Sequence, residues 1–328
     1  MSRLDCQIVT ADIGGTHARF ALATISPSAG MKVSPPVTLK TGEHASFETA
    51  LAEFQRQCDA PLPRDLALSF AGPVDGAVLK LTNNPWAIRP AQLAAGLGLQ
   101  RLTIVNDFGA VAHAAGAMDG SDLAHLCGPD EALPAEGVIT ILGPGTGLGV
   151  AALHRTAGGH QVIETEGGHV DFAPLDTLED RILTELRLSF RRVSTERLIS
   201  GRGLLNIYGV LATLENKPVT FHDERALWSA ALEGTDLLAV TALDRFCLTL
   251  GSVAGDLALA QGARAVVIAG GLGLRLAQHL PQTGFRDRFT AKGRFERRLD
   301  EMPVKVITHP QPGLLGAAAA WVRQHGNG

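Results

Sequence analysis

Two glycine-threonine segments far apart in the chain constrain its fold more than any other feature. The first is ADIGGTHARF at residues 11–20, and the second is ILGPGTGLGV at residues 141–150. Each lies between two short apolar runs, which predicts a strand, a tight turn and a second strand. Glycine lets the backbone approach a ligand closely with its N–H groups turned toward it. Two such hairpins in one chain indicate two half-molecules that grip the phosphates of one nucleotide.

The composition is that of an ordinary globular protein and argues against several functions. With 328 residues the chain is long enough for two domains with substantial cores. The net charge of −4 disfavours a nucleic-acid surface, and the basic run 286–298 contains acidic residues, as on a solvated face. The four cysteines are too dispersed for a metal knuckle, and the most apolar stretch, 246–260, is interrupted by Asp256. We expect a cytoplasmic protein that binds neither nucleic acid nor membrane.

Strand and helix signals alternate along the chain, which predicts an α/β fold. Strands are expected at 6–12, 17–24, 66–71, 102–106, 265–269 and 304–307. Helices are expected at 46–57, 90–96, 110–117, 178–190, 201–211, 224–232, 236–260 and 314–323. The two glycine hairpins form a weak internal repeat within this pattern.

Asp12 ends the first predicted strand, directly before the turn residues Gly14, Gly15 and Thr16. A carboxylate in that place suits Mg²⁺, which proteins often hold through water by one or two carboxylates and nucleotide phosphates. The alternative is a turn aspartate that caps the hairpin. The presence of a second hairpin favours the phosphate interpretation, so we expect Asp12 to hold Mg²⁺ through water.

The second loop is neither a dinucleotide fingerprint nor a Walker loop. It leads into a strand-like run in place of a helix, and no lysine follows its glycines. Its candidates for anion contacts are the backbone N–H groups of Gly145, Thr146 and Gly147. A later pair, Gly270 and Gly271, either lets a flat adenosine lie against the backbone or forms a strand-to-helix turn.

An apolar strand ends at Asn106 and Asp107, and a helix is expected to follow. One interpretation is a helix N-cap, because both residue types favour that position. The other is a catalytic base with a neighbouring hydrogen-bond donor, at the carboxyl end of a strand where α/β sites usually lie. The local sequence alone favours the cap.

Polar residues surround the glycine pair in Glu166-Gly-Gly-His169-Val-Asp171. With no further ligands nearby, a polyol site fits better than a metal site, since carboxylates accept hydrogen bonds from hydroxyls and imidazole donates or accepts. Glu196 is either a first-turn helix residue or a further hydroxyl acceptor, and both roles can hold together. Asn83, in the segment LTNNPW, is either part of a turn or an amide that lines a polar cleft.

Taken together, these segments resemble the bacterial glucokinases, hexokinase-type sugar kinases with the actin-like ATPase (ribonuclease H-like) fold. The matching segments run almost end to end and are ADIGGTHARFALA, SFAGPVDG, LTNNPWAI, VNDFGAVAHA, LGPGTGLGVA, ETEGGHVDFAP, STERLISGRGLLNIY, IAGGLG and PQPGLLGAAA. One departure is His17, where relatives usually carry Asn. It alters the outer hydrogen bonding of the loop without removing a group that the chemistry requires.

The resemblance implies two α/β domains flanking a cleft, a small one at 1–108 plus 310–328 and a large one at 109–309. It implies that Asp107 is the catalytic base and faces the 6-hydroxyl of glucose. The implied sugar contacts are Asn83, Asn106, Asp107, Glu166, His169 and Glu196. The implied nucleotide contacts are Asp12, Gly14, Gly15, Thr16, Gly145, Thr146, Gly147, Gly270 and Gly271. ATP and Mg²⁺ are the expected cofactors of a homodimer that acts in glycolysis.

The expected reaction is therefore the ATP-dependent phosphorylation of glucose at its 6-hydroxyl. An ordinary aspartate pKa of ~3.9 would leave Asp107 ionised at neutral pH, so no large shift of its pKa is expected. A kinase for another hexose or an amino sugar is the enzymatic alternative. A sugar-sensing regulator is less favoured, because the first strand starts too early for a helix-turn-helix before it and the net charge is negative.

Overall fold

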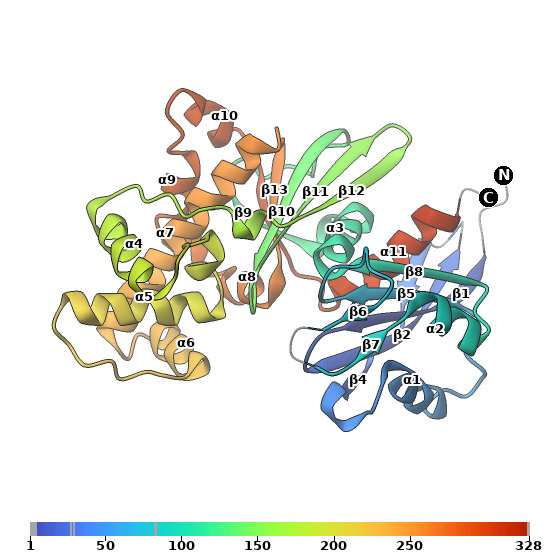
Figure 1. Cartoon of the computed structure of the whole chain (residues 1–328). Coiled ribbons are helices and arrows are strands. Elements are labelled where there is room, and N and C mark those ends of the chain that lie inside the picture. The colour runs from blue at the N-terminus through green and yellow to red at the C-terminus, as the bar shows by residue number, and fades with distance from the viewer. Residues whose placement is uncertain (1–4, 27, 29, 82–83, 327–328) are drawn as a thin grey trace. The chain divides into compact units, whose positions relative to one another are not determined.

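The computed structural model describes residues 5–26, 28, 30–81 and 84–326 and divides into two compact units (Figure 1). Unit 1 is Met1–Met118 with His309–Gly328, and unit 2 is Asp119–Thr308. The division predicted after residue 108 differs from this one by the length of helix α3 (Asp107–Ala117). In unit 1, α3 packs against α11 (Pro312–His325) so closely that a Cβ at Gly316 would collide with the Ala110 carbonyl.

The sheet of unit 1 has the strand order β3-β2-β1-β5-β8, and β4 also pairs with β2. β1 and β2 form an antiparallel hairpin, whereas β5 and β8 extend the sheet in parallel. The strands are β1 (Cys6–Ile13), β2 (His17–Ser26), β3 (Gly30–Val33), β4 (Val37–Lys40), β5 (Asp65–Phe70) and β8 (Arg101–Asn106). A separate ribbon pairs β6 (Leu79–Lys80) with β7 (Ala87–Ile88).

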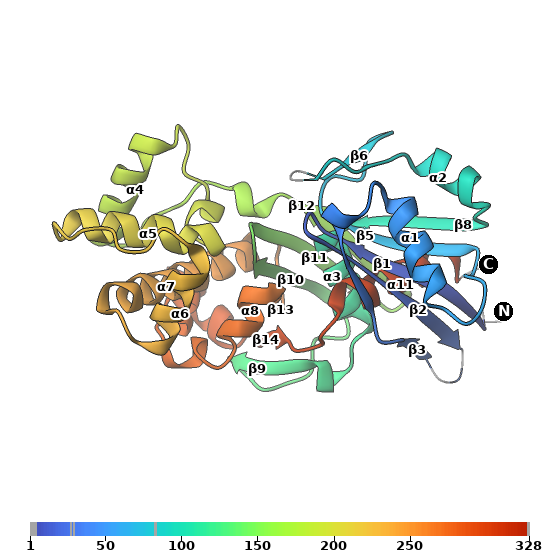
Figure 2. The same ribbon diagram turned by 90° about the horizontal axis from the view of Figure 1, so that it is seen from below.

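Helices cover both faces of this sheet (Figure 2). Both faces carry apolar side chains, because successive residues of a strand point to opposite sides of the sheet. The face with Val9 and Leu68 packs against α1 (Phe47–Arg56) and α2 (Pro90–Leu97). The opposite face, with Ile8 and Ala67, packs against Trp321 of α11. The last helix of the chain thus belongs to the same core as the first strand.

The sheet of unit 2 has the order β12-β11-β10-β13-β14-β9. The strands are β9 (Leu123–Cys127), β10 (Gly137–Pro144), β11 (Leu148–Thr156), β12 (Gly159–Thr165), β13 (Ala265–Ile268) and β14 (Val304–Ile307). β10 and β11 form the second glycine hairpin, and β13 and β14 continue in parallel. The path β12-β11-β10-β13-β14 therefore repeats the order and directions of β3-β2-β1-β5-β8.

Helix α7 (Leu237–Ala260) is the centre of the core of unit 2. The other helices there are α4 (Thr177–Ser189), α5 (Gly201–Leu214), α6 (Glu224–Glu233), α8 (Gly270–Leu276), α9 (Phe285–Thr290) and α10 (Glu296–Asp300). Among the described helices, α7 alone has the length and hydropathy of a membrane span, and 67% of its most apolar window is buried inside the fold. Its apolar character is thus used for packing.

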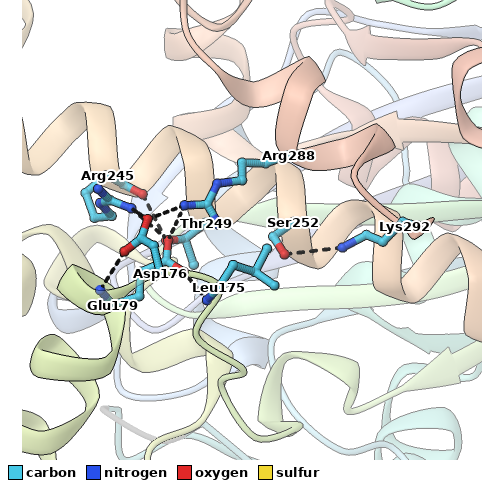
Figure 3. A network of polar contacts seen from close by, with 8 residues as sticks. All are labelled: Leu175, Asp176, Glu179, Arg245, Thr249, Ser252, Arg288 and Lys292. Atoms are coloured by element: carbon cyan, nitrogen blue, oxygen red, sulfur yellow. Dashed lines mark hydrogen bonds and ion pairs between the residues drawn. The ribbon is translucent and has the colours of Figure 1, made fainter. Parts of the chain in front are cut away.

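A polar network joins α4, α7 and α9 (Figure 3). Asp176 caps α4 by accepting a hydrogen bond from Glu179 N at 2.9 Å, and its carboxylate also pairs with Arg245 and Arg288. The buried Glu179 carboxylate lies 3.1 Å from Arg245 Nη1. Burial opposes ionisation of Asp176, but the Glu179 amide and the two guanidinium groups hold its pKa below the ordinary value.

The network corrects the expectation that the whole basic run 286–298 is a solvated face. Arg286 does pair with Asp300 at the surface. The side chains of Arg288 and Lys292, however, are only 15% and 7% exposed. They are buried because α9 lies directly on α7 at Gly251, where a Cβ would collide with the Phe285 carbonyl. Their charges are matched by acidic side chains, including Asp256 at 2.8 Å from Lys292.

Candidate active site

Asp12 lies near the end of β1, where neighbouring groups hold its carboxylate. Oδ1 accepts a hydrogen bond from Ser69 Oγ at 2.8 Å, and Oδ2 lies 3.3 Å from Nη1 of Arg19, its cross-strand partner on β2. Gly313, in the first turn of α11, faces the carboxylate so closely that a Cβ there would lie 2.7 Å from Asp12 Cγ. The carboxylate is therefore held in a defined orientation, which suits a group that positions a ligand.

The first glycine turn is closed by a hydrogen bond from Gly14 N to the His17 carbonyl at 2.9 Å. The Gly15 carbonyl accepts hydrogen bonds from Thr41 Oγ1 at 2.7 Å and Asn84 Nδ2 at 3.3 Å. Within the described chain, the turn amides that no other group engages are those of Gly15 and Thr16. The Gly14 amide, predicted to contact the nucleotide, thus forms a hydrogen bond within the turn. The amides of the next two residues are available to an anion.

Asn106 is the N-cap of α3, as the local sequence favoured. Its Oδ1 accepts hydrogen bonds from Phe108 N at 2.9 Å and Gly109 N at 3.3 Å, and its Nδ2 donates to the Gly72 carbonyl at 3.2 Å. Asp107 is the next residue and begins the helix. The capping Asn106 side chain therefore fixes the backbone that carries Asp107 at the end of β8. The cap and a catalytic role for Asp107 are thus compatible.

Asp12 and Asp107 line one hollow of about 270 Å³ in unit 1. Its walls are Asp12, Arg19, Asp107, Phe108, Val111 and residues 310–313. The only basic side chain in this lining is Arg19, and two carboxylates face the same space. Such a hollow is suited to a reaction in which a cation and a negatively charged group are handled together.

The pKa of Asp107 corrects the expectation of an ordinary value. Burial is the largest cause and, together with the nearby Asp12 charge, raises it to about 6, although the Phe108 amide and the Asn106 side chain act to lower it. The sequence placed Asp107 at a strand end but did not show that the fold would half-bury it beside a second carboxylate. A carboxylate with a pKa near 6 is well matched to general-base catalysis around neutral pH.

The second glycine turn, in unit 2, is built like the first. Gly145 N donates to the Gly147 carbonyl at 2.8 Å, and the Gly145 carbonyl accepts from Gly201 N at 2.8 Å. Leu148 N donates to Oε2 of Glu196 at 2.9 Å. In the described part of the chain, the turn amides that no other group engages are those of Thr146 and Gly147. Each hairpin thus offers two adjacent N–H groups to a ligand.

The predicted polyol residues of unit 2 lie on two short 3₁₀ turns. Glu166 and His169 form a loose pair, with 3.8 Å between Oε2 and Nε2, and their side chains are 79% and 52% exposed. Thr195 ties the turn of Glu196 to theirs, because Thr195 Oγ1 donates to the Gly168 carbonyl at 2.7 Å. The exposed side chains of Glu166 and His169 thus lie on a backbone that this hydrogen bond holds in place.

A hollow of about 760 Å³ borders the second glycine turn, a volume within the range of small-molecule sites. It is lined by Gly145, Thr146, Gly201, Arg202, Leu205, His222, Asp223, Glu224, Arg225, Trp228, Leu272 and Arg275. Gly270 begins α8 with φ of +79° and packs on the Pro144 carbonyl, as expected of a strand-to-helix turn. The space beside Gly271 is open.

Comparison with known proteins agrees with this geometry. A family model described as Glucokinase matches residues 9–325 of the chain. The chain belongs to the glucokinase family. The resemblance drawn from nine sequence segments is confirmed, and so is the class of enzyme.

Individual members of the glucokinase family cover almost the whole chain. The glucokinase of Zymomonas mobilis is 61% identical over 319 residues, which span 97% of this chain and 98% of the relative. The crystal structure of a glucokinase from an Antarctic psychrotroph superimposes with a TM-score of 0.87 at 31% identity and covers 98% of this chain and 100% of its own. A ROK family glucokinase from Streptomyces griseus, in complex with glucose and AMPPNP, shares the fold with a TM-score of 0.62 at 19% identity, covering 97% and 100%. The predicted actin-like ATPase fold is confirmed.

The geometry at Asp12 fits a magnesium ion of the kind expected in a kinase. Among the described residues, no three His, Cys, Asp or Glu side chains gather as a metal-binding group. Mg²⁺ bound through water to a carboxylate and to substrate phosphates needs no such cage. Asp12 is oriented by Ser69 and Arg19, and each carboxylate oxygen retains further acceptor capacity beyond these bonds.

Some site residues were missed by the sequence interpretation, and one prediction falls outside the structure. Asn83 lies outside the described residues. Arg19 was not singled out, although it stands opposite Asp12 once the hairpin register is known. The mixed-charge segment 222–225 carried no periodic signal, and its place beside the second turn depends on the packing of α6 against α5.

Proposed function

We propose that this chain transfers the γ-phosphoryl group of ATP to the 6-hydroxyl of glucose, with Asp107 as the general base. The observation that carries the proposal is the half-buried Asp107 carboxylate with a pKa of about 6, in a hollow shared with Asp12 and Arg19. At pH 7 most of this carboxylate is ionised and able to accept the proton of the attacking hydroxyl. Membership of the glucokinase family supports the choice of glucose and ATP.

The proposal divides the work between the two glycine turns. In unit 1, the amides of Gly15 and Thr16 and the Arg19 guanidinium neutralise phosphate charge. In unit 2, the amides of Thr146 and Gly147 do the same from the other hairpin. Phosphoryl transfer depends mainly on positioning and charge neutralisation, and the four backbone N–H groups and the Arg19 guanidinium can supply both.

Asp12 is proposed to hold Mg²⁺ through water. When bound, the ion would supply positive charge for the phosphate oxygens. The contribution of the chain is the fixed direction of the Asp12 carboxylate, which Ser69, Arg19 and the close approach of Gly313 maintain. Because these groups belong to the chain itself, they limit the reorganisation of the carboxylate when a nucleotide binds.

The sugar is proposed to be held by Glu166, His169 and Glu196, whose oxygen and nitrogen atoms accept or donate hydrogen bonds to its hydroxyls. Asn106 acts chiefly by placing Asp107, because its side chain already caps α3 and binds the Gly72 carbonyl. Hydrogen bonds to several hydroxyls would select a hexose over water as the phosphoryl acceptor. A hexose other than glucose, or an amino sugar, is the alternative substrate, and kcat/KM across a panel of sugars separates them.

The ROK family relative crystallised with glucose and AMPPNP supports a shared site for these ligand types on this fold. The family resemblance also supports a cytoplasmic homodimer with a place in glycolysis and no nucleic-acid or membrane partner. Size-exclusion chromatography with light scattering measures the mass of the protein in solution and so tests whether it is a dimer.

The test of the proposed function is Mg-ATP-dependent phosphorylation of glucose by the purified chain and by Asp107→Ala. The variant should lose at least about 100-fold in kcat, the usual effect of removing a general base, with a smaller change in KM for ATP. An inactive wild-type chain contradicts the proposed reaction. An Asp107→Ala variant with the wild-type kcat contradicts the role given to Asp107.

A further inference from the structure

Glu196 makes a contact that its role as a sugar acceptor does not require. Its Oε2 accepts a hydrogen bond from the amide of Leu148, the first residue of β11 and the residue directly after the second glycine turn. The two residues are 48 positions apart in sequence. One carboxylate oxygen is therefore committed to the phosphate loop, and the other is available to the sugar.

Gly147 shows how closely this carboxylate lies against the turn. A Cβ at Gly147 would occupy the place of Glu196 Oε2 and would lie 3.1 Å from its Cδ. Any side chain at position 147 would thus displace the carboxylate. The glycine is needed here for the approach of Glu196, since its φ lies outside the range that only glycine adopts readily.

The remainder of the sugar cluster is attached to the same end of β11. Gly168 packs on Leu148, where a Cβ would lie 3.0 Å from the Leu148 side chain. Thr195, beside Glu196, donates its hydroxyl to the Gly168 carbonyl. The Glu166 side chain, by contrast, is 79% exposed and pairs with His169 at 3.8 Å. Of the two glutamates proposed to bind sugar, Glu196 alone reaches the phosphate loop.

We propose that Glu196 is a positioning residue for the second phosphate loop, so that one carboxylate links the sugar site to the nucleotide site. By holding Leu148 N, it fixes the turn in which the Thr146 and Gly147 amides donate hydrogen bonds to phosphate oxygens. The inference rests on the proposed function and adds to it a physical coupling between the two substrates. A sugar hydroxyl that orders the free oxygen of Glu196 also orders the oxygen that holds the loop.

The sign of the charge effect makes the proposal testable. Removing a negative charge beside an anion site should by itself tighten nucleotide binding. Glu196→Gln keeps an amide oxygen that can accept from Leu148 N, so its Kd for AMPPNP should equal or fall below the wild-type value. Glu196→Ala removes the acceptor as well and should raise that Kd about tenfold, the effect of losing a hydrogen bond to a charged group.

The measurement is the Kd of Mg-AMPPNP by calorimetry in the absence of glucose, where a sugar contact cannot contribute. Glu166→Ala is the matched control, because it removes the other sugar-side glutamate without touching the loop. It should raise KM for glucose and leave the Kd for AMPPNP within about twofold of wild type. A Glu196→Ala variant that binds AMPPNP as tightly as wild type overturns the inference, even if glucose phosphorylation proceeds as proposed.

Gly147→Ala supplies a second route to the same contact, also when Glu196→Ala does not fold. Its methyl group should expel the carboxylate and weaken AMPPNP binding in the wild-type background. In a double-mutant cycle that combines Glu196→Ala with Gly147→Ala, the methyl group should have little further effect once residue 196 is alanine. Additive losses would show that the methyl acts on the nucleotide directly and would overturn the proposal. An inactive wild-type chain that still shows this non-additivity would instead contradict the proposed function alone.

Discussion

Asp107 carries the clearest consequence at the scale of single residues. Its pKa of about 6 predicts that kcat/KM for glucose rises with pH through about pH 6 and is level above pH 7, because only the ionised carboxylate accepts the hydroxyl proton. A pH–rate profile at saturating Mg-ATP measures this. Asp107→Glu provides the comparison, since moving the carboxylate should shift the apparent pKa. A profile that is flat down to pH 5 would contradict the assignment.

The same pKa predicts that the stability contribution of Asp107 falls as pH rises, whereas the activity rises. The folded-state pKa lies above the unfolded value of 3.8, so the contribution to stability is complete below about pH 4 and is lost as pH rises through about 6. At pH 8 the wild-type protein carries the cost of an ionised, half-buried carboxylate. Asp107→Asn should therefore be more stable at pH 8, by up to about 3 kcal/mol, and not at pH 4. Urea unfolding at the two pH values checks this.

The sequence predicted which residues of the site would carry charge but not their surroundings. Asp12 and Asp107 could be singled out because each ends an apolar strand beside a turn or helix start. The raised pKa of Asp107 and the bond from Glu196 to Leu148 arise from residues distant in the chain. No local pattern encodes such contacts, because they exist only once the elements have packed.

At the scale of elements, one helical glycine is required for close packing between helices and another is not. Gly251 of α7 faces the Phe285 carbonyl of α9, so Gly251→Ala should destabilise the protein by about 2–3 kcal/mol through overpacking. Gly209 of α5 has open space beside its Cα. Gly209→Ala is the matched control and should stabilise by about 0.5–1 kcal/mol, since alanine has the higher helix propensity. Chemical denaturation of both variants tests the pair, and equal effects would contradict the contact.

The long elements were predictable, whereas the short ones were not. The periodic segment 236–260 predicted a helix that the structure has as α7 (Leu237–Ala260). The ribbon of β6 and β7 and the short helices α9 and α10 escaped prediction. These elements are too short for a periodic signal, and tertiary contacts stabilise them, as the ion pair of Arg288 with Asp176 does for α9.

The topology of the whole molecule extends what the two glycine loops indicated. The sequence showed a weak repeat of two hairpins. The structure repeats the full strand path, with a hairpin followed by two parallel strands in each unit. The similarity of the two turns follows, because each lies at the same point of the repeated path. The parallel strands could not be matched from sequence, since their apolar runs lack distinguishing features.

The last helix joins the end of the chain to its beginning, and Trp321 is its main anchor in unit 1. Its side chain is fully buried among Ile8, Ala23 and Ala67, with the Arg101 guanidinium 4.4 Å from its ring centroid. Among the described side chains, its Nε1 is the buried polar atom without a hydrogen-bond partner. Trp321→Ala should therefore cost about 3–5 kcal/mol by opening a cavity.

Trp321→Phe is the informative companion to this change. It keeps most of the apolar volume and removes an N–H group that is buried without a partner, so its loss of stability should be clearly smaller than that of alanine. The remaining tryptophans, Trp86 and Trp228, lie one in each unit and report their unfolding by fluorescence. The Trp86 signal should shift to lower denaturant in Trp321→Ala, because α11 belongs to the core of unit 1. Equal destabilisation by phenylalanine and alanine would show that packing of the ring does not anchor the helix.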